Sequence, residues 1–325
     1  MADKTNETFL VTGALGCIGA WTVYHLVKQG RRVVSFDIAE QGHRLNLLMT
    51  PEEQQAITFV RGDLADPEQV LAAFQHYGVT HVIHLAALQV PFVRANPIKG
   101  AQVNVVGTVN VYEAARQTGV KHIALASSIA VFGPAEDYPD HQPVANDAHP
   151  SPRTLYGVFK QANEGTARIY WQDDQISSTG LRPYTVYGLG RDQGLTSDPT
   201  KAMLAAAAGQ NFHVNFGGVM QFQWASDTAQ QFIEAATHPL NGAYVFNLDA
   251  PPTPVAQVVE IIERLRPNVK ITMSDTVLPF PENFDGSELH RHFANVYDTP
   301  LEEGIRQTIE GFERALAERK ISVGA

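Results

Sequence analysis

Tyr156 and Lys160 stand four residues apart in the run Ser151-Pro-Arg-Thr-Leu-Tyr-Gly-Val-Phe-Lys. If this run is helical, the spacing puts the phenol and the ammonium on one face, one turn apart. An ammonium beside a phenol stabilises the phenolate and lowers a tyrosine pKa that is ordinarily about 10. Such a tyrosine can take a proton from an alcohol near neutral pH. The pair therefore predicts acid/base chemistry at a hydroxyl group, although the pattern is weak when it stands alone.

A glycine-rich turn near the N-terminus strengthens that prediction. Gly13, Gly16 and Gly19 follow a short apolar run, and a helix-like stretch and a second apolar run ending at Asp37 come after them. In a strand–turn–helix unit, such glycines allow a tight turn, close approach of the backbone to a pyrophosphate, and close helix–strand packing. The free amides of the helix N-terminus suit phosphates. Asp37 is placed to accept hydrogen bonds from a ribose and would repel a 2′-phosphate, so NAD is predicted rather than NADP.

Together these residues resemble the extended branch of the short-chain dehydrogenase/reductase family, which includes nucleotide-sugar epimerases, dehydratases and related dehydrogenases. Further segments in the usual order extend the resemblance through most of the chain, among them Gly62-Asp-Leu, His84-Leu-Ala-Ala and Ser127-Ser-Ile-Ala-Val-Phe-Gly. The resemblance implies an α/β fold, a Rossmann-type doubly wound parallel sheet with a smaller C-terminal substrate-binding lobe.

The resemblance also implies how the chain divides. We expect an NAD-binding domain at residues 1–185, with residues 227–250 returning to it. The substrate-binding lobe is expected at residues 186–226 and 251–325. In this family the helices that match the Tyr156 helix and the Asn104 helix pair across a twofold axis, which implies a homodimer.

Roles for individual residues follow from the same resemblance. Ser128 would hydrogen-bond the reacting oxygen, Tyr156 would be the acid/base, and Lys160 would lower the pKa of Tyr156 and hold the nicotinamide ribose. The residues expected to bind NAD lie in the glycine turn, at strand ends or on nearby helices: Gly13, Gly16, Cys17, Ile18, Gly19, Asp37, Asp63, Leu64, Leu85, Ala86, Ala87, Asn104, Ser127, Tyr156, Lys160 and Pro183. The residues expected to contact the substrate are Gln89, Ser128, Thr185, Arg191 and Trp224.

Apolar periodicity supports the fold independently of the resemblance. Short apolar runs alternate with helical stretches, which predicts a parallel sheet covered by helices on both faces. A ligand is then expected beyond the carboxyl ends of the strands. The strands are predicted at residues 8–12, 32–36, 57–60, 81–85, 122–127 and 244–248. Later helices are predicted at residues 227–238, 254–265 and 300–319.

Composition limits the partners. The chain has 325 residues, 44% of them hydrophobic, and a formal net charge of −10 with no basic cluster, which argues against nucleic acid and anionic membranes as partners. Its longest apolar stretch, residues 202–208, is far shorter than the ~20 residues that span a bilayer. The single cysteine, Cys17, rules out an internal disulfide. The polar start has no signal region, so we expect a cytoplasmic protein.

A metal site is not expected. His81 and His84 are three residues apart on a predicted strand, so their side chains would point to opposite faces. His290 and His292 are expected on the solvated surface of the smaller lobe, and the alternative is that they line the substrate pocket.

Two departures from the family bear on the substrate. Nucleotide-sugar members commonly carry an asparagine where this chain has Thr185, and a phosphate-gripping arginine where it has Met220. Neither methionine nor threonine can pair with a diphosphate. We therefore expect an NAD-dependent oxidoreductase that moves a hydride at a secondary alcohol of a small sugar, sugar acid or hydroxy acid. The alternative is an NAD-dependent epimerase of a sugar or nucleotide sugar, and a minor alternative is a non-catalytic NAD-sensing protein.

Overall fold

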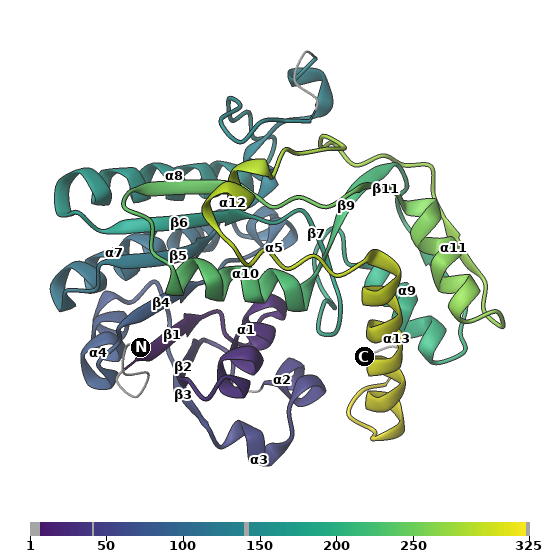
Figure 1. Cartoon of the computed structure of the whole chain (residues 1–325), viewed down its shortest axis with the longest axis horizontal. Coiled ribbons are helices and arrows are strands. Elements are labelled where there is room, and N and C mark those ends of the chain that lie inside the picture. The colour runs from purple at the N-terminus through teal and green to yellow at the C-terminus, as the bar shows by residue number, and fades with distance from the viewer. Residues whose placement is uncertain (1–6, 41, 140–142, 323–325) are drawn as a thin grey trace.

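The computed structural model describes residues 7–40, 42–139 and 143–322. Within them, seven parallel strands form one sheet in the order β10-β6-β5-β4-β1-β2-β3 (Figure 1). Its strands are β1 (Thr8–Thr12), β2 (Arg32–Asp37), β3 (Ile57–Arg61), β4 (His81–His84), β5 (His122–Ala126), β6 (Ser177–Arg182) and β10 (Ala243–Asn247). The predicted strands are confirmed with bounds that differ by at most one residue.

Helices cover both faces of this sheet because its strands are apolar on both sides. β1 is buried at all five positions. On one face, Leu26 and Phe232 belong to a core formed with α1 (Cys17–Lys28), α10 (Ala225–Thr237) and α12 (Ser287–His292). On the other face, Phe74 and Tyr112 belong to a core formed with α4 (Pro67–Tyr77), α7 (Gly107–Thr118) and α8 (Leu155–Asp174). The doubly wound α/β class predicted from the sequence is confirmed.

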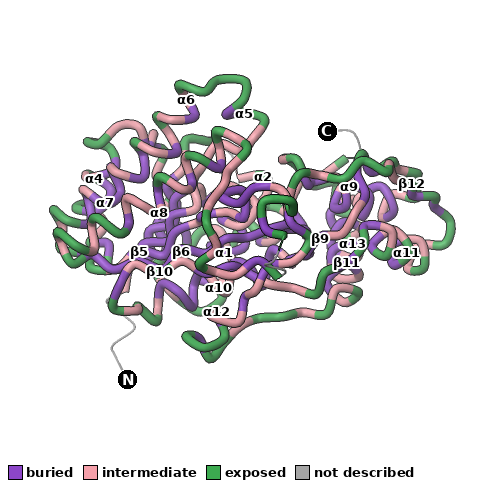
Figure 2. Tube along the Cα trace, turned by 90° about the horizontal axis from the view of Figure 1, so that it is seen from above, coloured by how far each residue is buried: buried purple, intermediate pink, exposed green. Residues whose placement is uncertain are grey.

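A smaller lobe follows the sheet and has its own core. Ile305, Ile309 and Phe312 lie on its last helix and are buried. Figure 2 shows the buried parts of the chain gathered in the sheet and, apart from it, around β9, α9 and α13. The elements of this lobe are β7 (Thr185–Tyr187), α9 (Asp198–Ala207), β8 (Phe212–Val214), β9 (Val219–Trp224), β11 (Pro252–Pro254), α11 (Val255–Leu265), β12 (Ile271–Met273) and α13 (Leu301–Ala317).

Two small sheets organise the lobe. β11, β9 and β7 form one, and β12 pairs with β8 in the other. The short strands β7, β8, β9, β11 and β12 were not predicted, because runs of three to six residues carry little periodicity. The exact division of the chain into two domains stays a prediction.

Short helical segments connect the larger elements. They are α2 (His43–Leu48), α3 (Pro51–Gln54), α5 (Val90–Ala95), α6 (Pro97–Ala101), the π-helical turn η2 (Gln102–Val106), and the 3₁₀ turns η3 (Ile129–Val131) and η4 (Ala135–Asp137). Over the part of the chain that the structure describes, no helix has both the length and the apolar character needed to cross a membrane.

Helix α8 carries an apolar stripe that faces solvent. Leu155, Val158 and Ile169 are 47%, 43% and 54% exposed. At about 100° per residue these positions share one face of the helix. Exposed aliphatic residues in a row on a long helix are typical of a contact between protein chains.

We predict that the protein forms a homodimer through this face of α8. Replacing Val158 with aspartate buries a charge in the contact and should convert the dimer to a monomer, as measured by light scattering at micromolar concentration. The matched control is Val277→Asp, because Val277 is 63% exposed on a different surface and should leave the dimer intact. A wild-type protein that is monomeric at this concentration would contradict the prediction.

Candidate active site

A cavity of about 520 Å³ lies beyond the carboxyl ends of the parallel strands. This is the place where open α/β sheets bind ligands. It is also lined by the segment that leads from β6 into the smaller lobe. The residues that were expected at a site and that line this cavity are Gly13, Gly16, Cys17, Ile18, Gly19, Asp37, Asp63, Leu64, Leu85, Ala86, Ala87, Gln89, Ser127, Ser128, Tyr156, Lys160, Pro183 and Arg191.

Two residues expected to contact substrate lie elsewhere. Thr185 is buried on β7 and its hydroxyl contacts the sulfur of Met220 at 3.4 Å. Side chains alternate along a strand, so the neighbours of Thr185 face the cavity and Thr185 does not. Trp224 lies at the end of β9 with its ring 5.7 Å from that of Trp21. The structure therefore corrects both substrate assignments.

Asn104 does not line the cavity but binds the loop after β4, which does. It was expected to bind the cofactor, but its side chain is fully engaged by the loop after β4. Its Oδ1 accepts from the Leu88 amide at 2.7 Å, and its Nδ2 donates to the Leu88 carbonyl at 2.9 Å. Asn104 therefore shapes the loop that follows β4.

The glycine turn has the geometry that a pyrophosphate requires. Gly13 has a φ of +66°, and a Cβ there would lie 2.6 Å from the Cα of Ala86. A Cβ at Gly19 would lie 2.1 Å from the Gly13 carbonyl oxygen, so α1 can begin directly above the turn only with glycine. No side chain caps the N-terminus of α1. Its amides and its dipole therefore fit the phosphates of a dinucleotide.

Two carboxylates mark the adenosine end of the cavity. Asp37 ends β2 and accepts from the Leu15 amide at 2.9 Å and the Ala39 amide at 3.0 Å, which fixes its orientation. Asp63 follows β3 and pairs with Lys99 at 3.0 Å. Lys99 was not identified from the sequence because no local pattern connects it to Asp63.

Helix α8 presents Tyr156 and Lys160 at the other end. Thr154 caps this helix by accepting from the Gly157 amide at 3.0 Å. A Cβ at Gly157 would lie 2.0 Å from the Ala130 carbonyl oxygen, so the helix packs directly on the turn after Ser128. The structure thereby brings together Ser128, Tyr156 and Lys160, the three residues predicted to be catalytic.

Burial controls the protonation of this group. It raises the pKa of Tyr156, while a hydrogen bond with Ser128 and the charge of Arg191 act to lower it. Burial also lowers the pKa of Lys160 to about 8, against the effect of Glu164. That the charge of Lys160 lowers the pKa of Tyr156 against this effect of burial stays a prediction. Lys160 Nζ donates to the Ala126 carbonyl at 2.5 Å and lies 5.6 Å from the centre of the Tyr156 ring.

Arg191 brings a further charge to the same end of the cavity. The residue is half-buried between Cys17 of the glycine turn and Tyr156, and burial lowers its pKa. One amino group donates weakly to the Thr196 hydroxyl at 3.4 Å. Its Nε is buried and has no hydrogen-bond partner among the described residues. This group can hold an anionic part of a ligand next to Tyr156.

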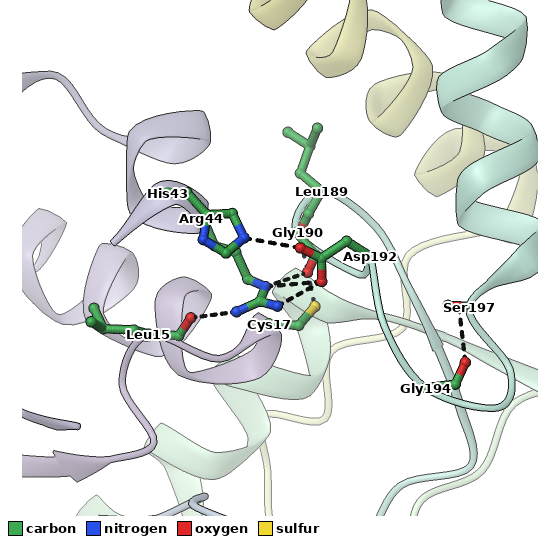
Figure 3. Close-up of polar contacts among 9 residues, drawn as sticks. All are labelled: Leu15, Cys17, His43, Arg44, Leu189, Gly190, Asp192, Gly194 and Ser197. Atoms are coloured by element: carbon green, nitrogen blue, oxygen red, sulfur yellow. Dashed lines mark hydrogen bonds and ion pairs between the residues drawn. The ribbon is translucent and has the colours of Figure 1, made fainter. Parts of the chain in front are cut away.

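A clasp of polar contacts holds the segment that carries Arg191 against the glycine turn (Figure 3). Arg44 of α2 pairs with Asp192 at 2.6 Å, and also donates to the carbonyls of Gly190 at 3.0 Å and Leu15 at 2.9 Å. His43 contacts the same Asp192 carboxylate at 2.9 Å. The contacts with Gly190 and Asp192 join residues about 150 positions apart, so no sequence pattern reveals them.

Two side chains of α1 complete the clasp. Trp21 donates its indole N–H to the Leu189 carbonyl at 3.0 Å, and the Cys17 thiol approaches the same oxygen at 3.9 Å. Burial raises the pKa of Cys17 to about 11, so its thiol is not a reactive nucleophile near neutral pH.

Comparison with known proteins identifies the family to which the chain belongs. The profile of the NAD-dependent epimerase/dehydratase family matches residues 9–248. The chain belongs to this family. It is therefore an NAD-dependent enzyme of the extended short-chain dehydrogenase/reductase type, as the sequence predicted.

Individual relatives cover nearly the whole chain. UDP-glucuronate 4-epimerase 3 of Arabidopsis thaliana is 30% identical over an alignment of 331 positions that covers 95% of this chain and 75% of that protein. The structure of MoeE5 in complex with UDP-glucuronic acid and NAD is 26% identical with a TM-score of 0.79, covering 95% of this chain and 99% of the other. L-threonine dehydrogenase of Clostridium difficile shares the fold at 21% identity, with a TM-score of 0.82 and coverage of 97% and 99%.

We predict that NAD binds at least ~10-fold more tightly than NADP, a difference of about 1.4 kcal/mol. Asp37 repels a 2′-phosphate, and the nearby cations Arg44 and Lys99 are already paired with carboxylates. Calorimetric titration of both cofactors measures the ratio. Asp37→Ser should reduce the preference, whereas Glu40→Gln should not, because Glu40 pairs with Arg61. Equal binding of the two cofactors to the wild type would refute the assignment.

We predict that Tyr156→Phe lowers kcat by at least ~10²-fold and leaves NAD affinity nearly unchanged, because only the proton carrier is removed. Since burial raises the pKa of Tyr156, oxidation by the wild type should accelerate as the pH rises above neutrality, and the variant should lose this dependence. Tyr170→Phe, at the far end of α8, is the control and should keep full activity. Near-normal turnover by Tyr156→Phe would exclude Tyr156 as the acid/base.

Proposed function

We propose that this enzyme moves a hydride between NAD and a secondary alcohol carbon of a small polyhydroxylated substrate, a sugar, sugar acid or hydroxy acid. Among these, we propose that acids are preferred. The observation that carries the proposal is the Arg191 guanidinium near Tyr156, whose buried Nε has no hydrogen-bond partner among the described residues.

Arg191 differs from the other cations in the cavity. Those are engaged within the protein: Arg44 with Asp192, Lys99 with Asp63, and Lys160 with the Ala126 carbonyl. A carboxylate on the substrate would satisfy the Nε of Arg191 through a charge-assisted hydrogen bond. That anchor would hold a neighbouring carbinol within reach of Tyr156.

The chemistry then divides among three side chains. NAD supplies the hydride acceptor when it is bound. Ser128 holds the reacting oxygen by a hydrogen bond, and Tyr156 takes the proton of the hydroxyl group. Lys160, fixed by the Ala126 carbonyl, provides a positive charge behind the phenol.

The preference for a small substrate rests on the absence of two diphosphate-binding side chains that nucleotide-sugar enzymes carry. Met220 and Thr185, which stand where nucleotide-sugar enzymes present a phosphate-gripping arginine and an asparagine, are buried against each other. Neither offers a group to a diphosphate. The cavity of about 520 Å³ must also hold the dinucleotide.

A second candidate is an NAD-dependent epimerase of a sugar or nucleotide sugar. Relatives that cover the chain are UDP-glucuronate 4-epimerases, and the carboxylate of a uronic acid would suit Arg191 equally well. The same three side chains serve both reactions, because an epimerase also removes a hydride from a carbinol before returning it to the other face.

We predict net NADH formation with small sugar acids or hydroxy acids, measured by absorbance over a panel that also contains neutral sugars, UDP-glucose and UDP-glucuronic acid. Arg191→Met should raise KM for the acid about 10- to 100-fold, the loss of 1–2 charge-assisted hydrogen bonds. KM for the neutral polyol of the same skeleton should change little. Arg61→Met is the control, because this exposed arginine lies outside the anion site.

Two results would overturn the proposal in favour of the epimerase. One is inversion of a sugar or UDP-sugar without NADH release. The other is low-micromolar affinity for UDP-glucose or UDP-glucuronic acid, measured by calorimetry on the NAD-loaded enzyme.

A further inference from the structure

Glu164 is a buried carboxylate on the catalytic helix to which neither the sequence nor the proposed reaction assigns a role. It lies four residues beyond Lys160 on α8. Its Oε1 accepts from the Ser127 hydroxyl at 2.5 Å and from Arg182 Nε at 2.8 Å, and its Oε2 accepts from a second Arg182 nitrogen at 2.8 Å. The side chains of Glu164 and Arg182 are only 11% and 6% exposed. One carboxylate thus joins α8 to the ends of both β5 and β6.

Arg182 is itself held in place. It donates to the Asn146 carbonyl at 2.8 Å and to Asn247 Oδ1 at 3.1 Å, and its guanidinium lies 4.8 Å from the centre of the Phe132 ring. These contacts leave the guanidinium no freedom to follow Glu164 if the helix moves. A buried ion pair of this kind adds little net stability, because desolvation offsets its attraction. The ion pair between Glu164 and Arg182 therefore serves to hold the two side chains in position more than to stabilise the fold.

The contacts of α8 with β5 are in strict register. Ala126 and Ser127, consecutive at the end of the strand, bind Lys160 and Glu164, one turn apart on the helix. The next residue along the chain is Ser128. A slide of the helix by one residue, about 1.5 Å, would break both contacts and displace Tyr156 from Ser128.

The charge of Glu164 also acts on Lys160. Burial lowers the pKa of Lys160 to about 8, and Glu164 acts in the opposite direction. The other groups that face Lys160 do not replace it. Tyr156 presents its ring, and His84 of β4 is neutral because burial lowers its pKa to about 3. Arg182 carries a positive charge that Glu164 neutralises.

We propose that Glu164, clamped by Arg182, is a positioning residue that fixes the register of α8 against β5 and β6 and holds its negative charge one helical turn from Lys160. The proposal rests on the assignment of Tyr156 and Lys160 as the acid/base pair and is independent of which alcohol is the substrate.

The test is Glu164→Gln, which keeps the shape and removes the charge. The Lys160 pKa should fall by about one unit, measured by ¹³C NMR titration of the lysine Cε signals and assigned with Lys160→Met. The value of kcat should fall about 10-fold with KM changed less than about 3-fold, and activity should decline at a lower pH than in the wild type. An unchanged Lys160 pKa together with unchanged kcat would overturn the proposal.

Two further variants separate position from charge. Glu164→Asp keeps the charge but shortens the side chain, so kcat should fall while the Lys160 pKa stays near the wild-type value. Ser127→Ala keeps the ion pair and should likewise leave the Lys160 pKa in place. Glu302→Gln is the matched control, since Glu302 of α13 forms an exposed pair with Arg264 of α11, and it should change neither quantity.

Glu164→Gln leaves a buried unpaired arginine and can fail to fold. The double variant Glu164→Gln with Arg182→Met removes both charges and keeps the test decisive. A lowered Lys160 pKa and low kcat in the double variant would support the proposal, and recovery of both to wild-type values would reduce the pair to a structural role. The NMR titration needs no substrate, so it tests the role of Glu164 even if the proposed substrate class is wrong.

Discussion

The close approach of α8 to the turn after β5 is the constraint on which the active site depends. Gly157 makes it possible, because any side chain at this position would collide with the Ala130 carbonyl oxygen, 2.0 Å from the position of a Cβ. The approach brings Tyr156 close to Ser128 and lets Lys160 Nζ reach the Ala126 carbonyl at the end of β5. Proton transfer from a substrate hydroxyl requires heavy atoms within about 3 Å, so a helix held further out would leave the phenol beyond the reach of an oxygen bound at Ser128.

Burial shifts the pKa values of Tyr156 and Lys160 in opposite directions. It favours the neutral form of each, which raises the pKa of Tyr156 and lowers that of Lys160. The groups that oppose burial are Ser128 and Arg191 for the phenol, and Glu164 for the ammonium. The residues around the pair, more than the spacing within it, therefore decide whether it carries charge at neutral pH.

Local sequence patterns were sufficient to predict the main sheet and the glycine turn, because the alternation of apolar runs with helical stretches and the spacing of the glycines are visible in short stretches of sequence. They were not sufficient for the contacts that close the site. Arg44 and Asp192, like Glu164 and Arg182, meet only in the folded chain. Thr185 was misplaced because the face of a three-residue strand cannot be read from so short a run. The effect of burial on the pKa of Tyr156 was missed for a related reason, since spacing reveals a neighbouring charge but not desolvation.

The clasp over the glycine turn bears on the choice between the two reactions. A dehydrogenase must exchange its cofactor at every turnover, whereas an epimerase regenerates it in place and gains from holding it. The ion pair of the clasp is partly solvated, because the Asp192 side chain is 42% exposed, and such pairs contribute only about 0–1 kcal/mol. The backbone contacts made by Arg44 and Trp21 add further hydrogen bonds, and those from the charged guanidinium are the stronger ones. These contacts order the segment around Arg191, and the dehydrogenase that we propose would have to open them to exchange NAD at every turnover, whereas an epimerase would not.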